Sequence, residues 1–119
     1  MGLDTFATRG PDIDLTEEDL AAFEAADINL CEGVRSGMTY GFRGKVYDNL
    51  VVEITGESLY QNWIPPETVK EMYEALMKCS PEQAVKGDYL YHITESDVVN
   101  LCKFFNVCAE RNLGLWGWW

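Results

Sequence analysis

Four stretches of the chain have the spacing of apolar and polar residues that predicts a helix, and the longest lies at 95–112. Thr94 precedes it as the N-cap, and Asp97 stands at the third helical position, which completes a capping-box pattern. Ile93 and Val98 flank this start as a hydrophobic staple. The apolar residues that follow share one helix face: Val98, Leu101, Cys102, Phe105, Cys108 and Ala109.

The segment LTEEDLAAFEAA (15–26) opens with the same signals. Thr16 is the expected N-cap, Asp19 the capping-box acid, and Leu15 and Leu20 the staple. The likeness to the start at Thr94 follows from capping chemistry and does not extend into an internal repeat.

A third helix is predicted in PPETVKEMYEALMKCSP (65–81). Pro66 suits the first turn, where its missing N–H costs nothing, and Pro81 is expected to stop the helix. The apolar stripe is expected in the core, with a methionine-lined groove for a partner as the alternative: Val69, Met72, Tyr73, Leu76 and Met77.

GKVYDNLVVEITG (44–56) fits either a helix or a strand. Val46, Leu50 and Ile54 form a helix face that Gly56 would end, whereas the β-branched residues also allow a strand. Polar Asp48 and Asn49 in the middle of the run favour the helix.

Two short stretches are predicted to be extended and to pair as a small ribbon, SLYQNWI (58–64) and YLYHI (89–93). The four-glycine segment 31–44 is expected to be a long loop. We therefore predict one domain over 1–119, mainly α, with about four helices packed with a small β ribbon; an α+β fold is the alternative.

Acidic residues dominate the chain, which has a net charge of −11 over 119 residues. Residues 1–32 carry a net −8, residues 33–45 a net +3, and residues 46–119 a net −6. This balance opposes binding to nucleic acid or anionic lipid, and it suits either a basic protein partner or simple solubility. Because the chain shows no signal peptide and no apolar run of about 18 residues, we expect a cytoplasmic protein.

The cysteines are expected to be buried, reduced thiols: Cys31, Cys79, Cys102 and Cys108. Only His92 could join them in a zinc site, and we expect no metal and no cofactor. DIDLTEED (12–19) has Glu17 where an EF-hand loop needs glycine, and SGMTYGFRGK (36–45) lacks the spacing of a phosphate loop.

A basic island at the glycine-rich segment 33–45 is the candidate anion or ligand site. Arg43 and Lys45 supply charge there, and the glycines would let backbone N–H groups approach a ligand. The alternative is that Arg35, Arg43 and Lys45 pair with the protein's own acids.

His92 is expected to be a partly buried structural residue, with a catalytic role as the alternative. Aromatic residues around the loop and the extended stretches either line a small-molecule pocket or pack the core: Tyr40, Phe42, Tyr47, Tyr60, Trp63, Tyr89 and Tyr91.

The chain ends in LGLWGWW (113–119), which holds three of its four tryptophans. We expect this tail to be docked, with Trp116, Trp118 and Trp119 either completing the core or crossing a twofold dimer interface. Gly114 and Gly117 are expected to let the chain turn back after the last helix. Membrane insertion is disfavoured, since only Arg111 lies nearby to meet anionic lipid.

MGLDTFA at the start and FRGKVYDNLVVEITGESLYQNWIPPE (42–67) together resemble small bacterial and environmental proteins of uncharacterised activity. The resemblance covers about a third of the chain and includes no catalytic signature. It implies a self-standing bacterial domain, and no functional residue is carried over from it.

Two functions follow as hypotheses. The first is a non-enzymatic protein-interaction domain that self-associates as a dimer or presents an acidic surface to a basic protein. The second is a small-ligand or enzyme module with a pocket between the loop 33–45 and the tyrosine-rich segments, built on Arg43, Lys45 and His92.

Overall fold

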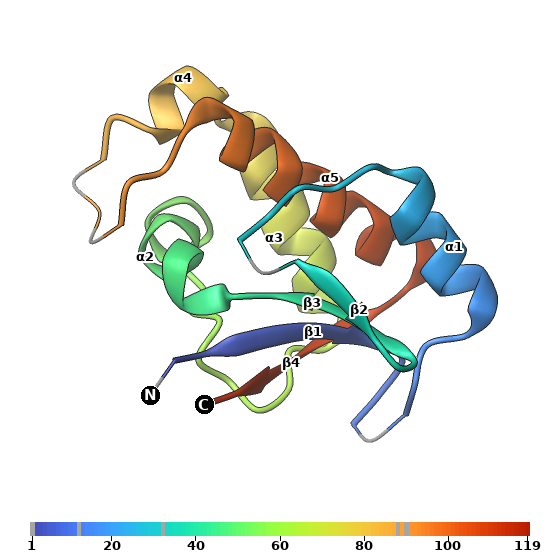
Figure 1. The fold of residues 1–119 in the computed structure, drawn as a ribbon. Coiled ribbons are helices and arrows are strands. Elements are labelled where there is room, and N and C mark those ends of the chain that lie inside the picture. Colours follow the sequence, from blue (N-terminus) through green and yellow to red (C-terminus); the bar gives the residue numbers. More distant parts are fainter. Residues whose placement is uncertain (1, 12, 32, 88, 90) are drawn as a thin grey trace.

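The computed structural model describes residues 2–11, 13–31, 33–87, 89 and 91–119, without the side chains of residues 34–36. Helices cover one side of a four-stranded sheet, and the two termini lie side by side (Figure 1). The elements in chain order are β1 (Asp4–Thr8), α1 (Glu17–Ala25), β2 (Val34–Ser36), β3 (Thr39–Phe42), α2 (Gly44–Thr55), α3 (Pro66–Lys78), α4 (Pro81–Ala84), α5 (Glu95–Arg111) and β4 (Gly114–Trp118).

The four predicted helices are confirmed as α1, α2, α3 and α5. Thr16 and Thr94 cap α1 and α5, and each cap forms a complete capping box with the acid three residues later. The ambiguous segment 44–56 is a helix, and Gly56 ends it in the left-handed conformation at φ 79°. These elements form where local side-chain signals suffice to start and stop a helix.

The prediction for Pro81 is wrong, because α3 already ends at Lys78 and Pro81 begins a further short helix, α4. Ser80 caps α4 by accepting a hydrogen bond from the Gln83 N–H. A proline in the first turn starts a helix as readily as a proline beyond the last turn ends one.

The sheet differs from the predicted ribbon. Its strand order is β2-β3-β1-β4 with antiparallel neighbours. The N-terminal strand β1 therefore lies inside the sheet and pairs with the C-terminal strand β4 at the edge. The stretches 58–64 and 89–93 are not paired as a ribbon: Ile64 forms one isolated bridge to Leu115, and Leu90 lies outside the described residues. The expected loop 31–44 contains the β2–β3 hairpin, which turns at Gly37 with φ 59°.

The core lies between the inner face of the sheet and the helices. Tyr40 of β3 stacks on Phe23 of α1 with ring centroids 4.8 Å apart, and Phe42 meets Phe104 of α5 edge to face at 4.9 Å. These rings therefore join the sheet to the first and last long helices. No helix among the described residues is long and apolar enough to cross a membrane.

The tail is docked as strand β4, which confirms that it is held in place. Asn112, with φ 57° and ψ 48°, makes the left-handed turn that was assigned to the glycines. Gly114 and Gly117 instead permit close contact, since a side chain on either would collide with the segment 59–64, which runs along the outer edge of β4. Leu113 and Leu115 are the tail residues that enter the core.

Candidate functional site

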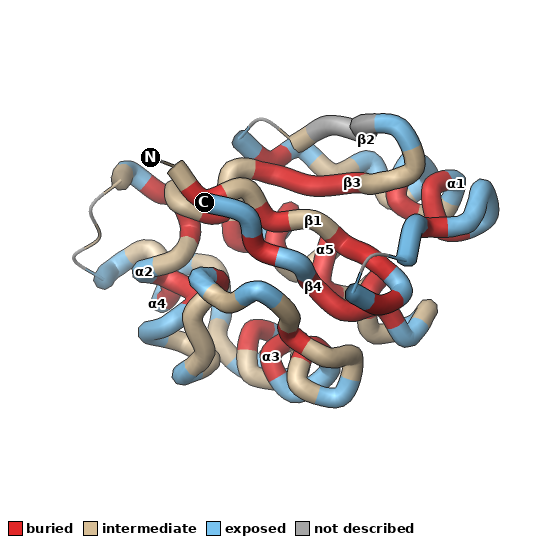
Figure 2. The backbone as a smooth tube through the Cα atoms, turned by 90° about the horizontal axis from the view of Figure 1, so that it is seen from below, coloured by how far each residue is buried: buried red, intermediate tan, exposed pale blue. Residues whose placement is uncertain are grey.

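The face of the sheet opposite the helices carries a row of aromatic side chains. Alternation along β1 and β4 places Phe6, Trp116 and Trp118 on this face, and no helix lies over these strands when they are seen from below (Figure 2). Phe6 and Trp116 are cross-strand partners with ring centroids 5.8 Å apart. The Trp116 and Trp118 rings are nearly parallel, with centroids 6.5 Å apart. We call these three residues the aromatic face.

Large apolar groups are left in solvent here. The three tryptophans of the tail are exposed: Trp116 by 38%, Trp118 by 63% and Trp119 by 48%. None of them completes the core, which was one of the two expected roles. Trp119 continues beyond β4 and meets Tyr60 edge to face, with centroids 5.6 Å apart. Three partly exposed tryptophans in a row are unusual for a soluble monomer and are typical of a binding surface.

A hollow of about 270 Å³ opens at the Trp116 end of this face. Its lining combines an indole, a carboxylate, an aliphatic chain and two hydroxyl-bearing residues: Trp116, Asp14, Ile13, Thr8 and Thr39. Ile13 and Asp14 come from the loop after β1, which Gly10 and Ile13 close by an antiparallel bridge. In the sequence Asp14 stood out only as part of an apparent calcium loop, and no pattern predicted this hollow. Asp12 of that loop lies outside the described residues.

The residues of the predicted basic island have contacts within the protein. Arg43 at the start of α2 forms an ion pair with Asp4 at 3.3 Å, and the Lys45 ammonium lies over the Tyr91 ring at 5.9 Å from its centroid. The ion pair of Arg43 agrees with the alternative that the basic residues pair with the protein's own acids, whereas the contact of Lys45 is with an aromatic ring. The side chain of Arg35 lies outside the described residues.

His92 is exposed in an irregular segment before α5, so the expectation of a partly buried residue in a strand is wrong. Its neighbour Ile93 is the residue that enters the core. Ile93 was expected to be the hydrophobic staple before the helix. This role, and not a strand, accounts for an apolar residue at the end of the stretch 89–93.

The tyrosines of the expected pocket have separate structural roles. Tyr47 is buried, its hydroxyl accepts a hydrogen bond from the Cys31 N–H at 2.8 Å, and burial raises its pKa to about 12. The Tyr89 hydroxyl donates to the Ala84 carbonyl at 2.7 Å. Tyr40 is in the core, whereas Tyr60 lies beside the tail. The arrangement does not gather them around one ligand.

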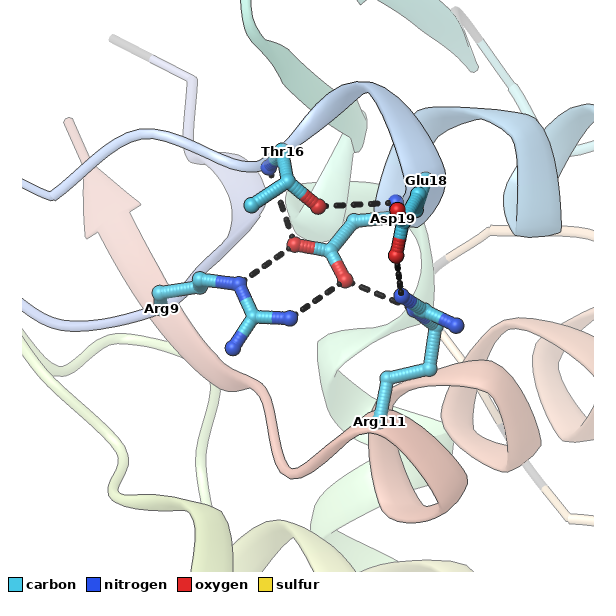
Figure 3. Close-up of polar contacts among 5 residues, drawn as sticks. All are labelled: Arg9, Thr16, Glu18, Asp19 and Arg111. Atoms are coloured by element: carbon cyan, nitrogen blue, oxygen red, sulfur yellow. Dashed lines mark hydrogen bonds and ion pairs between the residues drawn. The ribbon is translucent and has the colours of Figure 1, made fainter.

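Asp19 is a buried charged residue with several hydrogen-bond donors around it, and Figure 3 shows its partners. Its fully buried carboxylate accepts two hydrogen bonds from Arg9, at 2.7 and 2.8 Å, one from Arg111 at 2.6 Å, and one from the Thr16 N–H at 2.9 Å. Burial alone would raise the pKa of Asp19, but these donors hold it well below its usual range. The capping role of Asp19 was predicted from the sequence, whereas its contacts with Arg9 and Arg111 were not.

A second, mainly apolar hollow of about 370 Å³ lies between α3 and α5. Met77 and Val99 border it and are exposed, which places part of the predicted methionine stripe at the surface. Cys79 and Cys102 also line it and are partly buried, Cys31 is exposed, and Cys108 alone among the four is buried. All four are free thiols, so the expectation of burial is wrong for three of them.

Within the described residues, no group of three or more His, Cys, Asp and Glu side chains is placed to hold a metal ion. No protein-family model, curated protein or solved structure matches the chain. The aromatic face and the hollow beside Trp116 are therefore the features that bear on function.

Proposed function

We propose that this chain is a non-enzymatic protein-interaction domain that binds a basic segment of another protein with its aromatic face. The observation that carries the proposal is the row of Phe6, Trp116 and Trp118, with both tryptophans exposed, on a sheet surface that none of the described helices covers. Indole rings attract Lys and Arg side chains through their electron-rich faces. Two carboxylates flank the row. Asp14 lines the hollow beside Trp116, and Asp4, the cross-strand partner of Trp118, is already paired with Arg43.

The overall charge favours a basic partner over a second copy. Each chain carries a net −11, so two copies repel one another and a cationic segment is attracted. At physiological salt, the screening length of about 8 Å weakens both effects without removing them near the surface.

Self-association is the second candidate, and the exposed tryptophans are the observation that favours it. A second copy would cover the same apolar area and would have to overcome the charge repulsion, so raised salt would strengthen the dimer. The alternative of a ligand pocket at 33–45 has no comparable support, since Arg43 and Lys45 have separate partners and His92 is exposed.

The test uses a peptide of alternating glycine and arginine, with a glycine–glutamate peptide as the charge-reversed control, titrated calorimetrically into the protein. We expect binding of the cationic peptide only, weaker binding at high salt, and loss of binding in the double variant Trp116→Ser/Trp118→Ser. Met77→Ser, which removes an exposed apolar side chain from the helical side, is the control and should bind normally.

Equal binding by the wild type and the double tryptophan variant would contradict the proposal. Sedimentation of the same proteins tests the second candidate. A wild-type dimer that the double variant converts to a monomer would assign the aromatic face to self-association.

A further inference from the structure

The hollow at the end of the aromatic face has the lining of a receptor for one charged side chain. An indole wall (Trp116), a carboxylate (Asp14) and an aliphatic chain (Ile13) meet in about 270 Å³, and both Asp14 and Ile13 are exposed to an incoming group. A carboxylate at this point would be unfavourable in a flat hydrophobic interface, because the cores of such interfaces are depleted of charged residues.

Thr8 supplies a second, independent indication. It lines the same hollow, is only 5% exposed, and its Oγ1 has no hydrogen-bond partner among the described residues. A buried hydroxyl without a partner destabilises the folded protein, and native structures rarely keep one without a reason. An N–H donor from a bound group would satisfy it.

Thr5, three residues earlier on β1, provides the internal comparison. Its Oγ1 is also buried and has no partner in the part of the chain that the structure describes, but alternation places it on the opposite face of the strand, next to Gly44 in the core. The two threonines therefore share the same chemistry, and only Thr8 belongs to the hollow.

We infer that the hollow binds the guanidinium group of an arginine in the basic partner; this inference rests on the proposed function. The planar group stacks on the Trp116 indole, donates to the Asp14 carboxylate, and gives a further N–H to the Thr8 hydroxyl, while its aliphatic stem lies against Ile13. Arginine suits this lining better than lysine, because it combines a flat surface for stacking with several donors in fixed directions.

The test follows the Trp116 indole N–H signal by NMR during titration with N-acetyl-arginine methylamide. N-acetyl-citrulline methylamide has nearly the same shape without the charge, and N-acetyl-lysine methylamide has the charge without the plane. We expect a saturable shift with the arginine compound alone. Loss of a charge-assisted contact in Asp14→Asn should weaken binding by at least about tenfold.

Thr8→Val should also weaken binding of the arginine compound, whereas Thr5→Val should leave it unchanged. Equal shifts with arginine and citrulline, or with arginine and lysine, would overturn the assignment, as would full binding by Asp14→Asn. If Asp14→Asn still binds the glycine–arginine peptide while Trp118→Ser does not, the proposed function stands and this inference fails. If the wild type binds neither the peptide nor the arginine compound, both fail.

Discussion

Arg111, in the last turn of α5, donates a hydrogen bond of 2.6 Å to the buried carboxylate of Asp19 in the first turn of α1. The same carboxylate binds Arg9 after β1 and caps its own helix at Thr16. One side chain thus joins the first strand, the first helix and the last helix at a single point.

The first prediction concerns the removal of this charge. Asp19→Asn should lower the free energy of unfolding at pH 7 by about 3 kcal/mol, because it leaves Arg9 and Arg111 without their counter-charge. Urea unfolding measures the change. Glu18→Gln is the matched control: Glu18 is 89% exposed and lies 3.9 Å from Arg111, so its loss should change stability little.

The second prediction is the pH dependence of the same interaction. The donors lower the pKa of Asp19 in the folded state, so its contribution is complete above the unfolded pKa of about 4 and is lost as the pH falls below that value. The stability difference between the wild type and Asp19→Asn should therefore stay constant from pH 7 to about 5 and shrink by about 1 kcal/mol per pH unit below 4. A constant difference down to pH 2.5 would contradict the lowered pKa.

Local signals explain which parts of this fold were predictable. Both capping boxes need only residues three positions apart, and Gly56 needs only its own conformational freedom, so α1, α2 and α5 could be predicted with their starts or ends. Pro81 was misread because a proline is compatible with both the end of one helix and the start of the next.

The sheet depended on pairing that local patterns do not contain. β1 and β4 are five residues each and come from opposite ends of the chain, so neither shows its partner in its own sequence. For the same reason, the candidate site could be predicted from the sequence only in part. The tryptophans were conspicuous by composition, whereas Thr8 and Asp14 became site residues only when the strands and the loop after β1 brought them to Trp116.

The third prediction concerns the cap of α5. Thr94→Ala removes the hydroxyl that accepts the Asp97 N–H at 3.2 Å and should lower the free energy of unfolding by about 1 kcal/mol. Thr94→Ser keeps a hydroxyl at the cap and should retain most of the stability. Identical denaturation midpoints for the alanine variant and the wild type would mean that this cap does not stabilise the helix start.

The fourth prediction concerns thiol reactivity. Cys31 is exposed, while burial raises the pKa of the Cys102 and Cys108 thiols and disfavours their reactive thiolate forms. Iodoacetamide should modify Cys31 first and Cys108 last, and peptide mass spectrometry at timed intervals measures the order. In concentrated urea all four should react at similar rates, and an early reaction of Cys108 in the native protein would contradict its burial.

The last prediction separates the two roles of the tail. Ile64 and Leu115 exchange backbone hydrogen bonds of 2.8 and 2.9 Å, and Leu115 also pairs with Ala7 of β1. Deletion of residues 115–119 therefore removes a buried leucine and the pairing of β1 together, and it should lower the melting temperature sharply. Leu115→Ala alone should cost about 3 kcal/mol, as is usual for a buried leucine.

The matched control keeps the β4 backbone and removes only exposed rings. Trp118→Ser/Trp119→Ser should melt close to the wild type, since both side chains are about half exposed or more. A truncated protein with unchanged melting would show that β4 is not part of the stable fold. If the double tryptophan variant instead melts as early as the truncation, the rings stabilise the monomer, and their exposure cannot be attributed to a partner.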